Sequence, residues 1–264
     1  AESVHGGSIN QCVRWPVAGG DAFLKIAQAA NVATYEAEAA GLECLREANA
    51  LRVPRVLGVG VAGDQAVLAM EWFDFSPLVA DRPDVQARLG AGLAMQHRVL
   101  APKFGWHRAN VLGATPQPND DDTDWVRFLQ RRRLGHQLDL AAAKGLDARI
   151  VDRGRLLVER CGAFFSSYRP VPSLLHGDLW GGNWSAIGAT GEPVLFDPAV
   201  YFGDRETDIA MTRLFGGFGP AFYTAYQAEW PLDQAAGTRR TLYNLYHMLN
   251  HYNLFGGSYA RQAN

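Results

Sequence analysis

Short apolar runs bounded by Gly, Asn and Asp dominate residues 1–72 and predict β-strands joined by tight turns. We expect strands over 11–15, 22–26 and 66–73. The one long helical pattern in this part is 34–49, where Ala37, Ala40, Leu45 and Ala48 recur on one face. Residues 1–72 therefore predict a small sheet accompanied by one helix.

After Phe75 the apolar spacing changes to that of long helices. We expect helices over 84–100, 125–143, 148–168, 218–230 and 239–255, and another that begins at Asp208. The stretch 102–124 is rich in Gly, Pro, Asn and Asp and predicts an irregular loop. The change of pattern around residues 72–76 predicts an N-terminal domain over 1–72 and a larger, mainly helical domain over 73–264.

Composition restricts the class of protein. The 264-residue chain is 48% hydrophobic and 20% charged, which is typical of a globular protein with a sizeable core. A formal charge of −2 argues against a nucleic-acid partner. The chain has no apolar run of about 18 residues and no signal-peptide pattern, so we expect no membrane association. Cys12, Cys44 and Cys161 lack metal-binding spacing and predict free thiols in a reducing, cytoplasmic compartment. The composition does not predict an oligomeric state.

The stretch 174–208, LLHGDLWGGNWSAIGATGEPVLFDPAVYFGDRETD, carries the candidate chemistry. Asp178 lies two residues after His176 and five before Asn183, and Asp197 follows the strand-like run 194–196. In phosphoryl transfer a loop Asp orients the attacking hydroxyl, while an Asn and a strand-end Asp hold Mg²⁺ through hard oxygen atoms. The alternative is that these residues only form turns. Their combination in one loop, strand, loop arrangement favours Asp178 as the catalytic residue and Asn183 and Asp197 as Mg²⁺ ligands.

Four segments resemble the fructosamine kinase family, also called ketosamine 3-kinases. They are HGDLWGGN (176–183), FDPAVYFGDRETDIAMTRLFGGF (196–218), LYNLYHMLNHYNLFGGSY (242–259) and FGWHRANVLGATPQPN (104–119). The resemblance implies an α+β, two-lobed, protein-kinase-like fold, with a small antiparallel-sheet N-lobe containing one helix and a larger, mainly helical C-lobe. The family normally has a short segment before its glycine loop, so we expect residues to precede Ala1.

The resemblance also implies the reaction. ATP with Mg²⁺ would phosphorylate the 3-hydroxyl of a small-molecule or protein-bound ketoamine, and the product would then release its free amine, which is a deglycation repair. Asp208 would support the catalytic loop by accepting backbone N–H groups. Trp180 is the expected substrate contact, because its ring can stack on a sugar and attract a cationic nitrogen; the alternative is a core side chain that packs the loop.

The nucleotide-binding residues are expected in the N-terminal part. Gly6, Gly7 and Ser8 form a turn whose backbone N–H groups can approach phosphates. Lys25 lies in the strand-like run AFLKIA, opposite its apolar neighbours, and is expected to bind phosphates rather than to be a solvated edge lysine. By the family pattern Glu38 holds this lysine, and Glu36 is the nearest rival.

Gly58, Gly60 and Gly63 match the GxGxxG pattern of dinucleotide-binding loops. That pattern requires a helix to begin at the glycines, whereas the following residues predict a strand. We therefore expect a hairpin that leads into a hinge at Met70, Glu71 and Trp72, whose backbone would pair with adenine.

Several other polar groups remain open to more than one interpretation. The run Asp120–Asp122 predicts a solvated loop before a helix N-cap at Thr123 or Asp124 rather than a metal site. Arg131–Arg133 predicts a solvated face, and His176 is expected to orient its loop. The polar residues of 243–251 either form a buried network or line the substrate site, where His247 is the expected contact.

Two alternatives to a ketoamine kinase remain open. One is a kinase of the same fold that acts on an aminoglycoside, choline or another amino alcohol. The other is a nucleotide-binding pseudokinase, which the presence of Lys25, Asp178, Asn183 and Asp197 argues against. A protein kinase is not expected, because no APE segment or activation loop separates Asp197 from Asp208.

Overall fold

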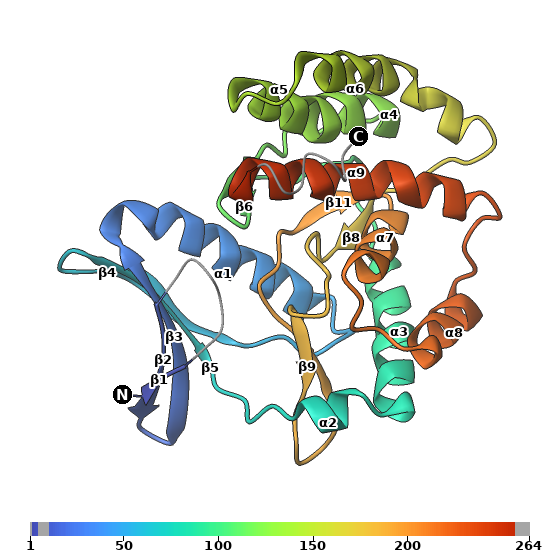
Figure 1. Ribbon diagram of the computed structural model, residues 1–264. Helices are drawn as coiled ribbons and strands as arrows, with labels where there is room; N and C mark the ends of the chain where they lie inside the picture. Colours follow the sequence, from blue (N-terminus) through green and yellow to red (C-terminus); the bar gives the residue numbers. More distant parts are fainter. Residues whose placement is uncertain (1, 5–10, 257–264) are drawn as a thin grey trace. The chain divides into compact units, whose positions relative to one another are not determined.

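The computed structural model describes residues 2–4 and 11–256, which belong to two compact units (Figure 1). Unit 1 comprises residues 1–96, 181–199 and 218–230, and unit 2 comprises 97–180, 200–217 and 231–264. Both units are discontinuous in sequence, and the expected division at residues 72–73 stays a prediction. No helix among the described residues combines the length and apolar character needed to cross a bilayer.

An antiparallel sheet forms the N-terminal part of unit 1. Its strands are β1 (Glu2–Ser3), β2 (Gln11–Val17), β3 (Gly20–Gln28), β4 (Val56–Ala62) and β5 (Gln65–Glu71), in the order β1-β2-β3-β5-β4. β3 is paired on both sides, so Lys25 lies on an interior strand rather than at a sheet edge. β4 and β5 form the expected hairpin, with Gly58 and Gly60 inside β4. The strand predictions for this part are confirmed, apart from shifts at the strand ends.

The expected helix of this part is α1 (Val32–Glu47), which contacts β4 and β5 after a short 3-10 turn at Ala29–Asn31. Its buried face contains Tyr35, Ala39, Leu42 and Leu45, at helical spacing. Burial of this face packs the helix on the sheet and determines which side of α1 meets the strands.

The remainder of unit 1 comes from three separate segments. They contain α2 (Pro77–Ala80), α3 (Pro83–His97), the hairpin of β9 (Trp184–Ala186) with β10 (Pro193–Leu195), and α8 (Pro220–Glu229). Main-chain hydrogen bonds tie the β9–β10 hairpin to two other parts of unit 1, because the amide of Leu195 donates to the carbonyl of Arg52 and that of Ser76 to the carbonyl of Ala186. Gly90 of α3 lies so close to Phe222 that an added Cβ would be 2.1 Å from its carbonyl oxygen.

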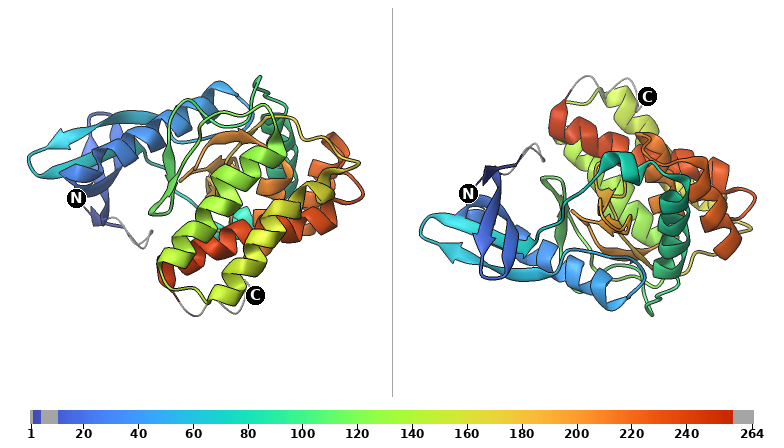
Figure 2. Two further views of the ribbon diagram at one scale, coloured as in Figure 1. Left: turned by 90° about the horizontal axis from the view of Figure 1, so that it is seen from above. Right: turned by 90° about the horizontal axis from the view of Figure 1, so that it is seen from below.

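Unit 2 is mainly helical. It contains α4 (Trp125–Phe128), α5 (Gly135–Ala143), α6 (Ala148–Arg160), α7 (Glu206–Leu214) and α9 (Ala236–Phe255), with the strand pair β8 (Ser173–Leu175) and β11 (Tyr201–Gly203). A π-helical turn, Leu129–Leu134, connects α4 to α5, and a 3-10 turn, Cys161–Phe165, follows α6. α5 contacts both α6 and α9, and α7 contacts α9 (Figures 1 and 2). The predicted helices are therefore present, with different ends.

Two sequence predictions for this unit were wrong. The stretch 102–124 is not wholly irregular, because β6 (Asn110–Leu112) and β7 (Thr115–Gln117) form a short hairpin in it. Arg133 is not on a solvated face, because 1% of its surface is exposed. Its guanidinium donates to the carbonyl of Pro118 and to the side chain of Asn119, and lies 3.9 Å from the ring centroid of Tyr201. These partners anchor the hairpin segment, and charge periodicity along α4 and α5 does not reveal them.

The acidic run of 120–122 forms the solvated loop that we expected. Asp121 pairs with Lys103, Asp122 pairs with Arg127, and Asp124 is the N-cap of α4, accepting the amide of Arg127 at 2.7 Å. Among the described residues no group of three or more His, Cys, Asp or Glu side chains could hold a metal ion.

Candidate functional site

The β9–β10 hairpin brings Asn183 and Asp197 together. Leu195 pairs with Trp184 in the last strand pair of the hairpin. The next residues outward, Asn183 and Phe196, therefore face each other at its open end. The amide of Phe196 donates to the carbonyl of Asn183 at 3.0 Å, and the Asn183 side-chain amide lies 3.4 Å from the carbonyl of Asp197. The antiparallel register therefore unites two candidate metal ligands that are 14 residues apart in sequence.

Asp197 has a positive φ of 55°, which is rare for a residue other than glycine. Such conformations persist only where the surroundings impose them, and they are concentrated at functional sites. The Asp197 side chain is 40% exposed, whereas Asn183 is 5% exposed. Asp197 is therefore the more accessible of the two candidate ligands.

Lys25 forms the charged centre of unit 1. Its Nζ lies 2.6 Å from Oε1 of Glu38 and 2.7 Å from Oδ1 of Asp197, and 6% of the residue is exposed. Burial disfavours a charged amine, but the two carboxylates outweigh it and raise the pKa of Lys25 above its ordinary value. Lys25 is therefore positively charged throughout the physiological pH range, as a phosphate-binding residue must be.

The ion pair with Glu38 is the one that the family pattern implies, whereas Glu36 lies on the exposed side of α1. The pairing with Asp197 joins residues 172 positions apart and has no local sequence signal. A carboxylate and an amide oxygen suit Mg²⁺, and Asp197 supplies an accessible carboxylate beside Asn183. Their chemistry fits a magnesium site that also holds a lysine for phosphate, and these binding roles stay predictions.

The expected hinge residues lie at the end of β5, where Met70 and Glu71 close the strand and Trp72 follows it. Met70 is 3% exposed and pairs with Phe23 of β3, while Glu71 forms an ion pair with Arg52 at 2.5 Å. The indole N–H of Trp72 donates to Asp74 at 2.8 Å, and the guanidinium of Arg14 lies 4.7 Å from the Trp72 ring centroid. These contacts hold the end of β5 in one conformation. Adenine recognition there stays a prediction, and the Gly6, Gly7 and Ser8 turn lies outside the described residues.

The loop of unit 2 that contains His176, Gly177 and Asp178 is anchored by Asp208 of α7. Its carboxylate accepts the backbone amides of His176 at 2.8 Å and Gly177 at 2.9 Å, and it lies 3.1 Å from Nε2 of His97. Burial would raise the pKa of Asp208, but the hydrogen bond from His97 and the nearby imidazoles hold this pKa below its ordinary value. Asp208 is therefore an ionised acceptor in the interior, in the bracing position that the resemblance implies.

His176 and Asp178 are linked through the backbone of the loop. Nδ1 of His176 accepts the amide of Asp178 at 3.3 Å, and His176 itself is fully buried. This contact agrees with the loop-orienting role expected for His176. The half-buried Asp178 stays the predicted catalytic residue.

The two expected substrate contacts lie in different environments. Trp180 is 40% exposed and touches Phe215 edge-on, so it is not a core side chain. His247 is 3% exposed, and burial lowers its pKa to about 3. Such burial gives no support to a direct contact by His247, although this role stays a prediction.

Other members of the 243–251 cluster form the buried polar network that was the alternative interpretation. The Tyr246 hydroxyl donates to Gln117 at 2.6 Å, Tyr243 donates to Asp204, and Asn250 accepts from Gln137 at 3.3 Å. These bonds tie α9 to the hairpin segment, to the β11–α7 connection and to α5.

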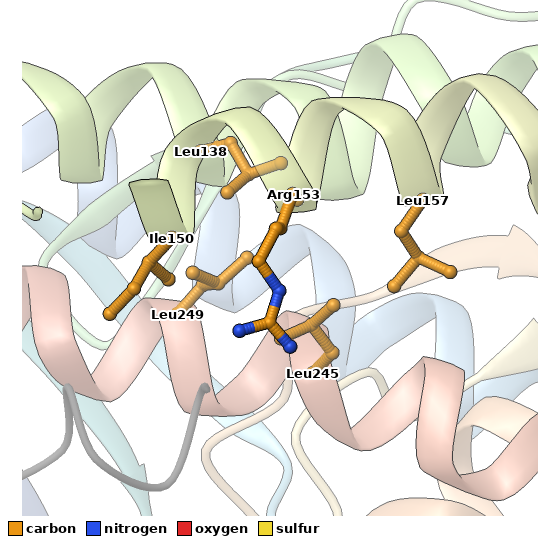
Figure 3. Close-up of a pocket in the computed structure, with 7 residues that line it drawn as sticks. Leu138, Ile150, Arg153, Leu157, Leu245 and Leu249 are labelled. Carbon is orange, nitrogen blue, oxygen red and sulfur yellow. The ribbon is translucent and has the colours of Figure 1, made fainter. Parts of the chain in front are cut away.

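An open hollow lies elsewhere in unit 2, between α5, α6 and α9 (Figure 3). Its walls are mainly aliphatic, with Leu138, Ile150, Leu157, Leu245 and Leu249 around the side chain of Arg153. The residues that line it include no pair of groups suited to acid–base or metal chemistry, so we do not assign the phosphoryl transfer to it.

Comparison with known proteins identifies the family. The family model described as fructosamine kinase matches residues 1–264. A Synechocystis protein provisionally named a ketoamine kinase is 42% identical over 262 residues, covering 99% of this chain and 86% of its own. A chloroplastic protein-ribulosamine 3-kinase of Arabidopsis thaliana is 39% identical over 264 residues, covering 99% of this chain and 79% of its own.

Solved structures agree with this result. A Haemophilus somnus protein provisionally named a fructosamine-3-kinase has a TM-score of 0.89 at 29% identity, covering 99% of this chain and 88% of its own. An aminoglycoside phosphotransferase in complex with AMP-PNP and hygromycin B has a TM-score of 0.68 at 14% identity, covering 99% of this chain and 90% of its own, and it supports the α+β protein-kinase-like fold alone. The chain belongs to the fructosamine kinase family, whose members are ATP-dependent phosphotransferases.

Proposed function

We propose that this protein uses Mg·ATP to phosphorylate the 3-hydroxyl of ketoamines, free or attached to protein. The observation that carries the proposal is the buried Lys25 held between Glu38 and Asp197, since Asp197 also adjoins Asn183. This group combines a phosphate-binding cation with metal-binding oxygen atoms, as ATP chemistry requires. Membership of the fructosamine kinase family supports a ketoamine as the acceptor.

Each candidate residue has a distinct role in the proposed reaction. Lys25 binds the α and β phosphates, and Glu38 holds the lysine in place. Asn183 and Asp197 hold Mg²⁺, which when bound neutralises phosphate charge. Met70, Glu71 and Trp72 receive the adenine, and Gly6, Gly7 and Ser8 cover the phosphates.

Asp178 orients the acceptor hydroxyl and takes its proton late in the reaction. The oxygen of the acceptor forms a bond to the γ-phosphorus, the bond between this phosphorus and the bridging oxygen breaks, and ADP leaves. Asp208 acts through His176 and Gly177, because its two accepted hydrogen bonds position the loop. The 3-phosphorylated ketoamine then decomposes and returns the free amine, which would make the reaction a deglycation step.

We also propose a cytoplasmic location. Cys44 and Cys161 are thiols that take part in no disulfide, which is usual for proteins of a reducing compartment.

The test measures Mg·ATP consumption with a fructosyl-amine, a ribulosyl-amine, choline and an aminoglycoside. We expect turnover with a ketoamine, and Asp178→Asn should lower kcat by about 10²–10⁴-fold because it removes the proton acceptor. Asp152→Asn is the matched control, since it removes a carboxylate on the exposed face of α6. Turnover of choline or the aminoglycoside alone would refute the acceptor assignment, and ATP binding without any turnover would indicate a pseudokinase.

A further inference from the structure

Four aromatic side chains of unit 2 form a continuous chain of ring contacts, which we call the aromatic strip. It comprises Trp180, Phe215, His251 and Phe255. The successive ring centroids are 6.4 Å apart from Trp180 to Phe215, 4.8 Å from Phe215 to His251 and 5.8 Å from His251 to Phe255. Three segments distant in sequence contribute to it, so no single helix pattern predicts the strip.

The strip begins at the catalytic loop. Trp180 is two residues after Asp178, and its amide donates to the Asp178 carbonyl at 3.2 Å. Phe215 is the C-cap residue of α7, and His251 and Phe255 lie one turn apart on α9. The strip therefore leads from the residue proposed to act on the acceptor to the C-terminal end of α9.

The rings of the strip are accessible rather than part of the core. Trp180 is 40% exposed, Phe215 42% and Phe255 56%. The His251 ring is partly buried, and its Nδ1 donates to the carbonyl of His247 at 2.8 Å, which fixes the ring plane. Contiguous exposed aromatic groups are costly in water and typically mark a binding surface.

We propose that the aromatic strip binds the polypeptide around a glycated lysine, so that peptide-borne or protein-borne ketoamines are preferred over free ones. This inference rests on the proposed function, because Asp178 must act on the ketoamine for the strip to follow it. The end at Trp180 receives the ketoamine itself, and the rings beyond it receive the neighbouring residues of the substrate chain.

The chemistry of the outer rings favours a polypeptide over a second sugar. Phe215 and Phe255 have no hydrogen-bonding atoms, whereas sugar hydroxyls withdrawn from water need polar partners. An extended chain advances about 3.3 Å per residue, so the steps between successive rings match one to two residues each. Aliphatic and aromatic side chains of a peptide can pack on such rings, with contributions like those of other aromatic contacts.

The experiment compares two acceptors that carry the same ketoamine. One is free Nε-fructosyl-lysine, and the other is a blocked peptide with that residue at its centre between apolar residues. We expect Phe255→Ser to raise KM for the peptide by about 3- to 10-fold, from the loss of one aromatic contact, with kcat unchanged and with free fructosyl-lysine unaffected. Phe255→Tyr should restore the peptide KM. Leu156→Ser is the matched control, because Leu156 is 46% exposed on α6 outside the strip.

Several results would overturn the inference. An equal rise in KM for both acceptors would mean that Phe255 contacts the ketoamine or only supports the fold. An unchanged KM for both acceptors would mean that the strip has no role in recognition. A change in sedimentation of Phe255→Ser at unchanged KM would assign the strip to a second copy of the chain. If the wild type phosphorylates neither acceptor, the proposed function is wrong. Calorimetric titration of the protein with the peptide then tests the strip independently, because a peptide that does not bind contradicts the inference.

Discussion

His247 makes the stability of this protein depend on pH in a way that one substitution can isolate. Its imidazole is 3% exposed, and burial, then the neighbouring His251, lower its pKa from 6.5 to about 3. Asp208 opposes this shift and Arg133 adds to it. The folded protein therefore holds His247 neutral at pH values where the unfolded chain protonates it.

The sign and size follow from proton linkage. Between pH 6.5 and about 3 the unfolded state binds more protons at this position, so stability falls as the pH is lowered and is fully retained above 6.5. At about pH 5.5 the ratio of protonated to neutral His247 in the unfolded chain is roughly ten to one, which lowers the free energy of unfolding by about 1.4 kcal/mol. At about pH 5 the free energy of unfolding is lowered by about 2 kcal/mol. The folded pKa of about 3 lies below both pH values, so the folded imidazole stays neutral at each of them.

The perturbation is His247→Leu, which replaces the imidazole with an apolar side chain of similar size that cannot titrate. Urea unfolding followed by fluorescence and circular dichroism gives the free energy of unfolding, provided that the two transitions coincide. We expect the wild type to lose about 1.4 kcal/mol more than the variant between about pH 8 and pH 5.5. The difference at about pH 8, where both states hold a neutral imidazole, isolates the packing effect of the substitution. Equal losses in the two proteins would refute the reasoning.

Two further predictions concern buried charges of unit 2. Arg239 is 1% exposed and donates to both carboxylate oxygens of Glu206, at 2.7 and 2.8 Å. Arg239→Met leaves that carboxylate buried without its partner, so it should lower the free energy of unfolding by about 3–5 kcal/mol. Adding Glu206→Gln should recover part of this loss, and urea titrations measure both effects. Full stability of the single variant would contradict a buried ion pair. Asp208→Asn removes the charge that accepts the amides of His176 and Gly177, so it should cost about 1.5–3 kcal/mol and lower kcat while the Kd for ATP, measured by calorimetry, changes little. An unchanged kcat would show that the brace is dispensable.

Local patterns were sufficient for most of the longer helices and strands. Short apolar runs between turn residues in 11–26 and 66–73 predicted three strands, and the stripe of small and apolar residues in 34–49 predicted α1. The short hairpin of β6 and β7 was missed, because its strands are three residues long and lie among Gly, Pro and Asn that favour turns.

Charge patterns predicted exposure less well than apolar patterns predicted burial. Three consecutive arginines at 131–133 suggest a solvated face, yet Arg133 is enclosed by neutral carbonyls, an amide and aromatic rings. A long cationic side chain can be buried beside such partners. Its acceptors at Pro118 and Asn119 and the ring of Tyr201 come from segments that no local period connects to Arg133.

The amino-acid sequence by itself determined which residues could carry phosphoryl-transfer chemistry. The acids, the amide and the lysine stand at spacings that follow from loop and strand geometry, and the family resemblance extends over nearly the whole chain. Tertiary structure alone decided which of them meet. The second carboxylate on Lys25, the burial of His247 and the aromatic strip all join segments that are far apart in sequence, because packing and desolvation act between distant segments while propensity and periodicity act only along the chain.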